Sequence, residues 1–561
     1  MTKSVTASLW CLTLGYVVAV LLSGLMQPVG TTDESLPWVS ALQIRRHMAP
    51  HTDFWSPYPP LTYWLLAGVF SVLGDTAVAG RLLGTVFFLV LLIAVTLLAR
   101  RNFGARSWQV PYAVLLAVLG AGPIFVYAFG IALAASLCAL LSYFIVFRSR
   151  PALTLIPGFI LAITLLLRMN FAAYAAAAII LDLALVKKLR FAGFIVGPML
   201  IALLVYFVPY QGTMGVVWNQ IVTVPRDVLA HTRFIPLPDY LLYYAAIALP
   251  LAWFSLRMLA GDHSSRLSYA PLGIAGAVCA AAYLARSNAA LLPAISLAVL
   301  TGVVLLDRYV FRLRRTERGL LALYALFLHY ILFRADEWHL RPLLALIGLL
   351  LPFLILPWIL ARGRTASLLL AGTFLALIVV PLWKLHSFRP DRPSMISAVN
   401  LIRAGEFIHK TPDSERFLGA GAAMLRPEWQ QLFPDLEELK ALRYVYARTT
   451  ESDCVYVGVP KHASVFVADI RAYWLLHRCI GVKRFVLEPG VTTTEPEEEE
   501  MIRNLQQNRV RWVVLTPPVR GDEAFLRNPI PGSDLLDAAI ALHYQVAATF
   551  GSYTVLTATG F

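Results

Sequence analysis

The sequence predicts a polytopic α-helical membrane protein with a C-terminal α/β domain. Of its 561 residues, 58% are hydrophobic and only 14% are charged, which leaves too little polar surface to cover a soluble globule. The formal net charge of +14 is unevenly spread: residues 1–386 hold 28 Lys and Arg against 12 Asp and Glu, whereas residues 387–561 hold 19 against 21. We therefore expect two domains, 1–386 in the membrane and 387–561 outside it.

Apolar runs of about 15–22 residues, most of them long enough to cross a ~30 Å hydrocarbon core, predict about thirteen transmembrane helices. They lie at residues 8–28, 78–99, 109–127, 129–147, 152–168, 171–186, 191–209, 239–256, 269–285, 289–306, 319–333, 342–361 and 365–385. Basic residues gather in alternate loops, such as Arg100 and Arg101, Lys187 and Lys188, and the arginines of 308–318. The positive-inside rule makes that face cytoplasmic, so the N-terminus is cytoplasmic and residues 387–561 are extracytoplasmic. The basic charge thus indicates topology rather than nucleic-acid binding.

Residues 60–75 are also apolar. A crossing here would invert every later loop and place the basic 308–318 segment outside, so we predict a re-entrant or interfacial segment instead. The first span is expected to be an uncleaved anchor, because no small-residue cleavage site follows it.

Asp33 and Glu34 follow the first span directly, in the first outer loop, residues 29–77. Carboxylates beside hydrocarbon are costly unless they face water or a ligand, so this acidic pair is a candidate functional site. The simpler interpretation is a solvated loop carboxylate at the end of a helix. Position alone leaves both interpretations open.

The C-terminal domain alternates strand and helix patterns. Short β-rich runs lie at 454–458, 484–487 and 511–515; helical patterns lie at 468–478, 496–508 and 533–544, and a hairpin is expected around Gly551. The acidic run from Glu495 to Glu500 suits the first turn of a helix, where carboxylates face the positive end of the dipole. Cys454 and Cys479 are the two cysteines of this domain, and the sequence leaves a disulfide between them open.

An internal repeat points to a phosphate-binding turn. Residues 286–293 and 334–342 share an Arg, a polar residue two positions on, and a Pro before the next apolar run. In the second copy Arg334, His339 and Arg341 could grip a phosphate, since an Arg fork pairs with two oxygens and His is a further donor. The alternatives are interfacial anchoring by long Arg side chains and pairing with the neighbouring acids.

The segment from Asp33 through Tyr58-Pro-Pro-Leu-Thr-Tyr-Trp64 to Gly74-Asp75 and Arg81 resembles the first outer loop of GT-C membrane glycosyltransferases. It is similar in particular to the bacterial family 39, protein-mannosyltransferase-like enzymes, such as the aminoarabinose and galacturonic acid transferases of lipopolysaccharide. The match is best over residues 8–170. The resemblance implies a bacterial inner-membrane enzyme that uses a polyprenyl-phosphate sugar, inverts the anomeric centre and has Asp33 as its catalytic base.

Two positions depart from the family pattern. Tyr58 stands where a Lys often precedes the Pro-Pro pair. Where some members carry a second Asp after Tyr-Ala-x-Gly, this chain has Tyr127-Ala-Phe-Gly130 followed by Ile-Ala-Leu-Ala-Ala-Ser136. We retain Tyr58 as a candidate substrate-binding residue and carry over no role to the stretch 127–136.

The chemistry of the residues agrees with this implied reaction. Glycosyl transfer needs a carboxylate to take the acceptor proton and cations to stabilise the departing phosphate. Asp33 is the expected base, and Glu34 would orient the site or help to hold a divalent metal, for which no further ligand cluster stands out. The expected phosphate ligands are Arg334, His339 and Arg341, with Arg226, His231 and Arg233 of the 210–238 loop as second candidates. The expected partners are a polyprenyl-phosphate-sugar donor, a lipid, glycan or protein acceptor, and membrane lipids, with no nucleic acid.

A lipid transporter or flippase, or an inactive member that presents lipid, is the alternative function. Charged residues in the middle of spans would favour transport. Acids are nearly absent there, and Asp182 lies close to the cytoplasmic end of its span. The sequence therefore favours the transferase.

Overall fold

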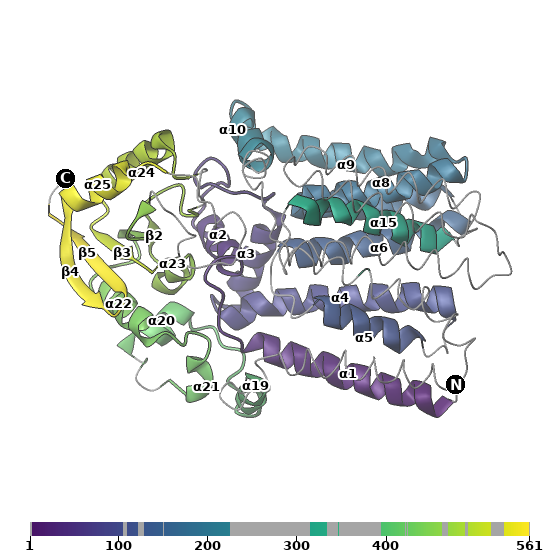
Figure 1. The fold of residues 1–561 in the computed structure, drawn as a ribbon, viewed down its shortest axis with the longest axis horizontal. Helices are drawn as coiled ribbons and strands as arrows, with labels where there is room; N and C mark the ends of the chain where they lie inside the picture. Colours follow the sequence, from purple (N-terminus) through teal and green to yellow (C-terminus); the bar gives the residue numbers. More distant parts are fainter. Residues whose placement is uncertain are drawn as a thin grey trace, which may run out of the picture.

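The computed structural model describes residues 3–104, 109–121, 128–149, 151–224, 315–333, 346, 394–420, 422, 425–462, 469–487, 492–517 and 532–559. A bundle of long helices meets an α/β domain end-on, and residues 26–76 form a layer between the two (Figure 1). The predicted domain boundary near residue 386 and, apart from residue 346, the predicted spans within 239–306 and 342–385 lie outside the described residues. The count of thirteen spans therefore stays a prediction.

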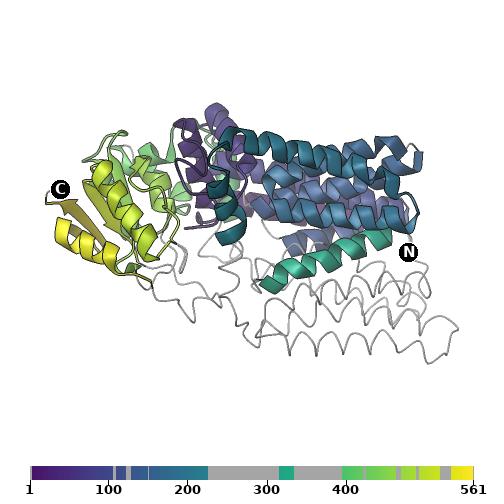
Figure 2. The same ribbon diagram turned by 90° about the horizontal axis from the view of Figure 1, so that it is seen from above.

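The bundle contains eight described helices. They are α1 (Lys3–Leu25), α4 (Ala77–Phe103), α5 (Gln109–Ala121), α6 (Ala128–Ser149), α7 (Leu155–Leu167), α8 (Met169–Leu185), α9 (Ala192–Phe207) and α15 (Arg315–Phe333). Shorter helical turns are η1 (Pro151–Thr154), η2 (Leu189–Phe191), η3 (Val208–Tyr210), α10 (Met214–Trp218) and η4 (Asn219–Thr223). Seen from above, the teal helix α15 lies at one edge of the described helices (Figure 2).

The described bundle is that of a membrane protein. Within the described residues, four helices are long and apolar enough to cross a bilayer: Thr6–Leu25, Ala77–Arg101, Gly130–Phe147 and Leu189–Tyr210. On α9, Leu204 and Val205 are about two-thirds exposed in the isolated chain. Large aliphatic side chains on an outer helix face match a hydrocarbon environment rather than water.

The layer between the bundle and the α/β domain holds two helices, α2 (Ser35–Arg45) and α3 (Leu61–Leu73). The 13 residues of α3 span only about 20 Å, too short to cross a ~30 Å core. Both flanks of α3 bond to the α/β domain: the Trp55 N–H donates to the Lys483 carbonyl, and the Asp413 N–H to the Asp75 carbonyl, each at 3.0 Å. The chain therefore enters and leaves α3 on the same side of the bundle, as a re-entrant or interfacial segment requires.

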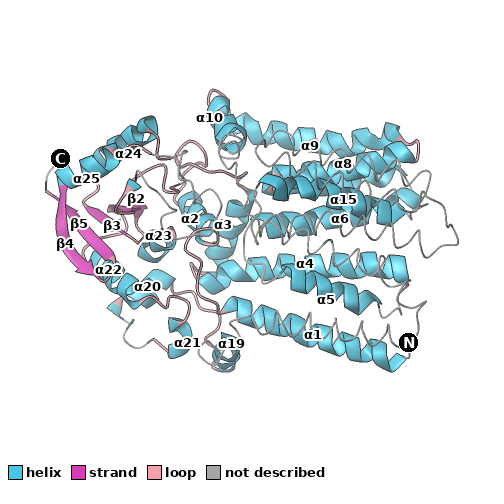
Figure 3. Cartoon of the chain, viewed as in Figure 1, coloured by secondary structure: helices cyan, strands magenta, loops and turns pink. Residues whose placement is uncertain are grey.

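The α/β domain is built on a five-stranded sheet of order β2-β1-β3-β5-β4 (Figure 3). The strands are β1 (Cys454–Gly458), β2 (Cys479–Ile480), β3 (Trp512–Leu515), β4 (Tyr544–Phe550) and β5 (Tyr553–Ala558). β1 runs parallel to β2 and β3, and β5 runs antiparallel to β3 and β4. The helices are α19 (Ser394–Arg403), α20 (Asp413–Leu418), α21 (Pro427–Gln430), α22 (Leu436–Tyr446), α23 (Arg471–Leu476), α24 (Glu495–Gln507) and α25 (Leu535–His543).

One predicted strand is wrong. Residues 484–487 form no strand, and the second strand lies earlier, at Cys479–Ile480. Phe485, Val486 and Leu487 are buried, so their apolar pattern reflects packing rather than pairing in the sheet. The predicted hairpin around Gly551 is confirmed, with that glycine at φ +55°, and Cys454 and Cys479 form a disulfide that joins paired positions of β1 and β2.

Candidate active site

The two acids after α1 lie in different environments. The Asp33 side chain is exposed, whereas Glu34 is 7% exposed. Arg81, in the second turn of α4, donates through Nε to Glu34 Oε1 at 2.7 Å and through Nη2 to Oε2 at 3.0 Å. The Gly30 N–H adds a third bond, to Oε2 at 2.8 Å. Both Glu34 oxygens are thus occupied, and Asp33 is the carboxylate of the pair that faces solvent.

Arg81 also fixes the segment that leads from α1 to Asp33. Its guanidinium donates to the carbonyls of Leu25 at 3.0 Å, Gln27 at 2.6 Å and Pro28 at 3.2 Å. Arg81 is 1% exposed, and a buried guanidinium requires such a set of acceptors. This arginine, quoted above only as part of the resemblance, therefore supports the backbone before the acidic pair.

Tyr58 lies against Arg168, a residue that belongs to none of the sequence motifs described above. The guanidinium carbon of Arg168 is 4.8 Å from the centre of the Tyr58 ring and 5.6 Å from that of Phe171. Arg168 is buried and has extended backbone between α7 and α8. Arg168 is the last residue of the predicted span 152–168, at its predicted outer end, and this position of a basic residue was the signal in the sequence that could have identified it. Cation–π contacts of this kind hold a guanidinium in one orientation.

A buried polar network joins residues 51–56 to the end of α9. The two ring nitrogens of His51 lie 2.9 Å from Gln220 Oε1 and 2.7 Å from the Tyr206 hydroxyl. Gln220 Nε2 donates to the His51 carbonyl at 2.9 Å, and its Oε1 accepts from the Ser56 N–H at 3.1 Å. Burial lowers the pKa of His51, which favours the neutral imidazole. The network places the start of the 210–238 loop beside the Tyr58 segment.

Six predicted phosphate ligands, Arg226, His231, Arg233, Arg334, His339 and Arg341, lie outside the described residues. Their role stays a prediction. Among the residues that the structure describes, no three or more His, Cys, Asp or Glu side chains are grouped closely enough to hold a metal ion.

Asp182 is the acid within a predicted span that was considered for the transporter alternative, and it contacts two other helices inside the bundle. Its Oδ2 accepts from the Tyr143 hydroxyl at 2.6 Å, and its Oδ1 lies 3.6 Å from Arg318 Nη2. These contacts lie toward the end of α8 that is farther from Arg168. They give Asp182 a packing role between helices.

Comparison with solved structures shows a shared fold. The chain superimposes on ArnT from Cupriavidus metallidurans in the apo state with a TM-score of 0.50 and 14% identity over 97% of both chains. For the same protein bound to undecaprenyl phosphate the TM-score is 0.49, with 13% identity and 97% of both chains covered. The archaeal oligosaccharyltransferase AglB from Archaeoglobus fulgidus gives 0.35, with 12% identity, over 98% of this chain and 74% of that one.

No protein-family model and no curated protein matches the sequence. The apo ArnT superposition, which extends over nearly the whole of both chains, confirms the predicted GT-C fold. At this identity the likeness concerns the fold, and the activity has to be argued from the site.

Proposed function

We propose that this chain is an integral membrane glycosyltransferase that moves a sugar from a polyprenyl-phosphate donor to an extracytoplasmic acceptor, with inversion at the anomeric carbon. The observation that carries the proposal is the position of Asp33. It is an exposed carboxylate in the predicted first outer loop of a GT-C fold, next to a buried acid whose oxygens are already bonded.

In the proposed reaction Asp33 acts as general base. An acceptor hydroxyl attacks the anomeric carbon from the face opposite the phosphate and gives its proton to the Asp33 carboxylate. The bond between that carbon and the phosphate oxygen breaks, and its electrons leave with the polyprenyl phosphate. A positioned base contributes roughly 10²–10⁴-fold to such a step.

Glu34 is the weaker candidate for the base. To reach a substrate it would have to leave Arg81, and breaking a buried ion pair costs about 3–5 kcal/mol. We therefore assign Glu34 to the support of the loop. Both Glu34 oxygens already accept hydrogen bonds from Arg81 or Gly30, so these contacts do not support a metal ion at Glu34.

Arg168 joins the predicted phosphate ligands. It lies against Tyr58, and Tyr58 occupies the place of the family's frequent Lys. A guanidinium held by an aromatic face at this end of the bundle suits the negative charge that develops on a departing phosphate. Arg334, His339 and Arg341 remain predicted ligands of the same group.

The test is transfer by the purified full-length protein in lipid nanodiscs. Undecaprenyl-phosphate-linked aminoarabinose, galacturonic acid and mannose are supplied with lipopolysaccharide, a polysaccharide or a peptide as acceptor, and products are read by mass spectrometry. We expect Asp33→Asn to lower kcat by ~10²–10⁴-fold and to leave donor binding intact. Asp53→Asn is the matched control, because Asp53 is an exposed acid of the same outer loop.

Near-native turnover of Asp33→Asn would falsify the assignment of the base and move it to Glu34. Movement of the lipid across the membrane without sugar transfer would instead support the transporter alternative.

A further inference from the structure

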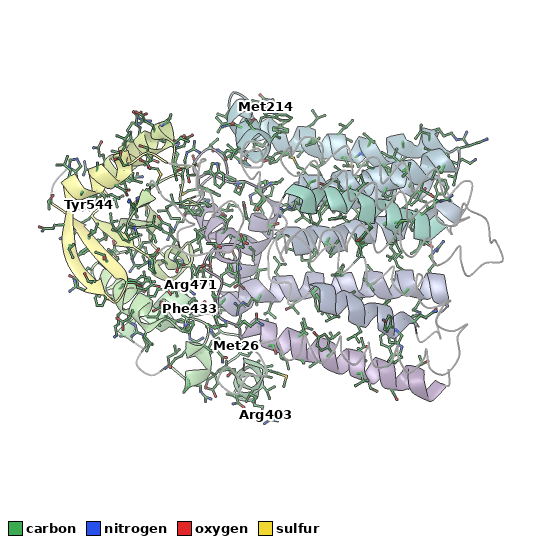
Figure 4. All side chains as sticks on the ribbon, in the orientation of Figure 1. Met26, Met214, Arg403, Phe433, Arg471 and Tyr544 are labelled. Atoms are coloured by element: carbon green, nitrogen blue, oxygen red, sulfur yellow. A yellow bond between two sulfur atoms is a disulfide. The ribbon has the colours of Figure 1, made fainter. Side chains whose placement is uncertain are left out.

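A second buried arginine reaches the segment before Asp33, and it comes from the α/β domain. Arg471, the first residue of α23, donates through Nη1 to the Val29 carbonyl at 2.9 Å, and its backbone N–H donates to the Thr31 carbonyl at 3.0 Å. The Val29 N–H donates in turn to the Leu432 carbonyl at 2.8 Å. Figure 4 shows Arg471 on the side of the α/β domain that faces α1.

Arg471 is itself held by two buried carboxylates. Its Nε donates to Glu438 Oε1 at 3.1 Å, its Nη2 bonds to the other Glu438 oxygen, and Asp469 Oδ2 lies 3.2 Å from Nη2. Glu438 is fully buried, and Arg471 and Asp469 are nearly so. A planar guanidinium fixed by a bidentate carboxylate has little freedom. The contact with Val29 therefore comes from a rigid group.

The two buried arginines divide the segment between them. Arg81, on the membrane helix α4, takes the carbonyls of residues 25, 27 and 28. Arg471, on the α/β domain, takes the carbonyl of residue 29 through its guanidinium and that of residue 31 through its backbone N–H. Residues 26–34 have no regular secondary structure, so these bonds replace the backbone hydrogen bonds that a helix or strand would supply. Asp33 follows two residues after the last of them.

We infer that Arg471 is a positioning residue for Asp33, so that the α/β domain forms part of the active centre. The inference rests on the proposed function, in which Asp33 is the base. A base must be held close to its productive geometry, and a displacement of about 1 Å can cost ~10²-fold in rate. Loosening Arg471 would allow residues 29–33 such a displacement while the donor site stays formed.

The test compares Arg471→Lys with Arg46→Lys in the full-length protein in nanodiscs. Arg46 also joins the α/β domain to the layer beneath it, donating to the carbonyls of Arg478 at 2.6 Å and His477 at 3.0 Å, but it makes no bond to residues 25–34. Lysine keeps the positive charge at both sites but lacks the several fixed N–H donors of the planar guanidinium. The donor is whichever of the three undecaprenyl-phosphate-linked sugars named above gives turnover with the wild type.

We expect Arg471→Lys to lower kcat by ~10–10²-fold with the donor KM within about twofold of wild type, since it displaces the base and leaves donor contacts alone. Hydrogen–deuterium exchange of the peptide 27–36 should become faster in this variant and stay unchanged in Arg46→Lys. Equal losses in both variants would show that Arg471 only docks the domain. Unchanged kcat and exchange in Arg471→Lys would overturn the inference.

Glu438→Gln is the second variant, for use where Arg471→Lys is not recovered folded. It keeps Arg471 and weakens one of its two anchors, so a smaller fall in kcat with a smaller rise in exchange is expected. No change in either would contradict the inference. If the wild type transfers none of the sugars, the proposed function fails by itself, while the exchange of residues 27–36 still shows whether Arg471 fixes the segment.

Discussion

At the scale of single residues, buried charges tie the two parts of the chain together. Asp413 of α20 accepts through Oδ2 from the Ala77 N–H at 2.7 Å and from Trp474 Nε1 at 3.3 Å. Ala77 is the first residue of α4, so this carboxylate from the α/β domain lies at the positive end of a membrane helix. Even so, burial raises the pKa of Asp413 to about 6, with Arg416 and Arg81 acting in the opposite direction.

This carboxyl predicts a pH dependence of stability. Its pKa when folded is above the ordinary 3.8, so the folded state binds the proton more tightly than the unfolded state. The stability that Asp413 contributes is therefore full below about pH 4 and is lost as pH rises to about 6, a loss of roughly 3 kcal/mol at most. Asp413→Asn keeps one acceptor oxygen and removes the titration.

We expect the melting temperature of Asp413→Asn, measured in detergent, to rise relative to wild type between pH 4 and pH 6 and to hold a constant difference above that range. Asp534→Asn changes an exposed acid of the same domain and is the control. Parallel melting curves for Asp413→Asn and wild type across this range would contradict the prediction.

At the scale of elements, the local patterns predicted three of the seven described helices of the α/β domain, α23, α24 and α25. They missed α19 to α22, and the strand prediction failed where burial and pairing diverge. The acidic run at 495–500 does begin a helix. Thr494 is the residue before α24, and the carboxylates of Glu495, Glu497 and Glu498 lie in the first turn of that helix, where they face the positive end of its dipole. The apolar run at 484–487 is buried but unpaired. Whether a segment forms a strand depends on which other segments lie beside it in the sheet. The apolar composition of a segment indicates only that it is buried.

The disulfide is the element-scale contact with the clearest expected effect on stability. Cys454 and Cys479 are separated by 25 residues, and a disulfide closing a loop of this length contributes about 2–4 kcal/mol by restricting the unfolded chain. It also holds the two-residue strand β2 at the edge of the sheet. We expect the Cys454→Ser, Cys479→Ser double variant to unfold at a lower temperature than the wild type.

A reductant should lower the melting temperature of the wild type toward that of this double variant and leave the variant itself unchanged. Cys11→Ser provides the control for loss of a free thiol. A reductant that alters neither protein would show that the disulfide contributes nothing to stability.

At the scale of the whole molecule, the sequence predicted the class of fold and the loop that carries Asp33, but not the groups that hold this loop. Arg81 is 47 residues from Glu34, and Arg471 is 442 residues from Val29. No periodicity or spacing connects positions so far apart. Their partnership depends on how the α/β domain rests on the bundle, which is a tertiary property.

The sidedness of the whole chain is the last prediction. α8 begins next to Arg168, which contacts Tyr58 in the layer under the α/β domain, so the turn from α8 to α9 lies at the opposite end of the bundle, with the N-terminus of α1 (Figure 1). That turn contains the exposed basic residues Lys187, Lys188 and Arg190. By the positive-inside rule it is cytoplasmic, and the α/β domain is then outside.

We therefore expect Ser533→Cys, in the α/β domain, to react with an impermeant maleimide in intact cells. Lys188→Cys should react only after the membrane is opened. Both variants are made with Cys11 and Cys138 replaced by Ser, since these are the free cysteines among the described residues. The parent without either added cysteine controls for background labelling. The reverse pattern would place Asp33 on the cytoplasmic side, because Asp33 and the α/β domain lie at the same end of the bundle, and the extracytoplasmic acceptor would have to be abandoned.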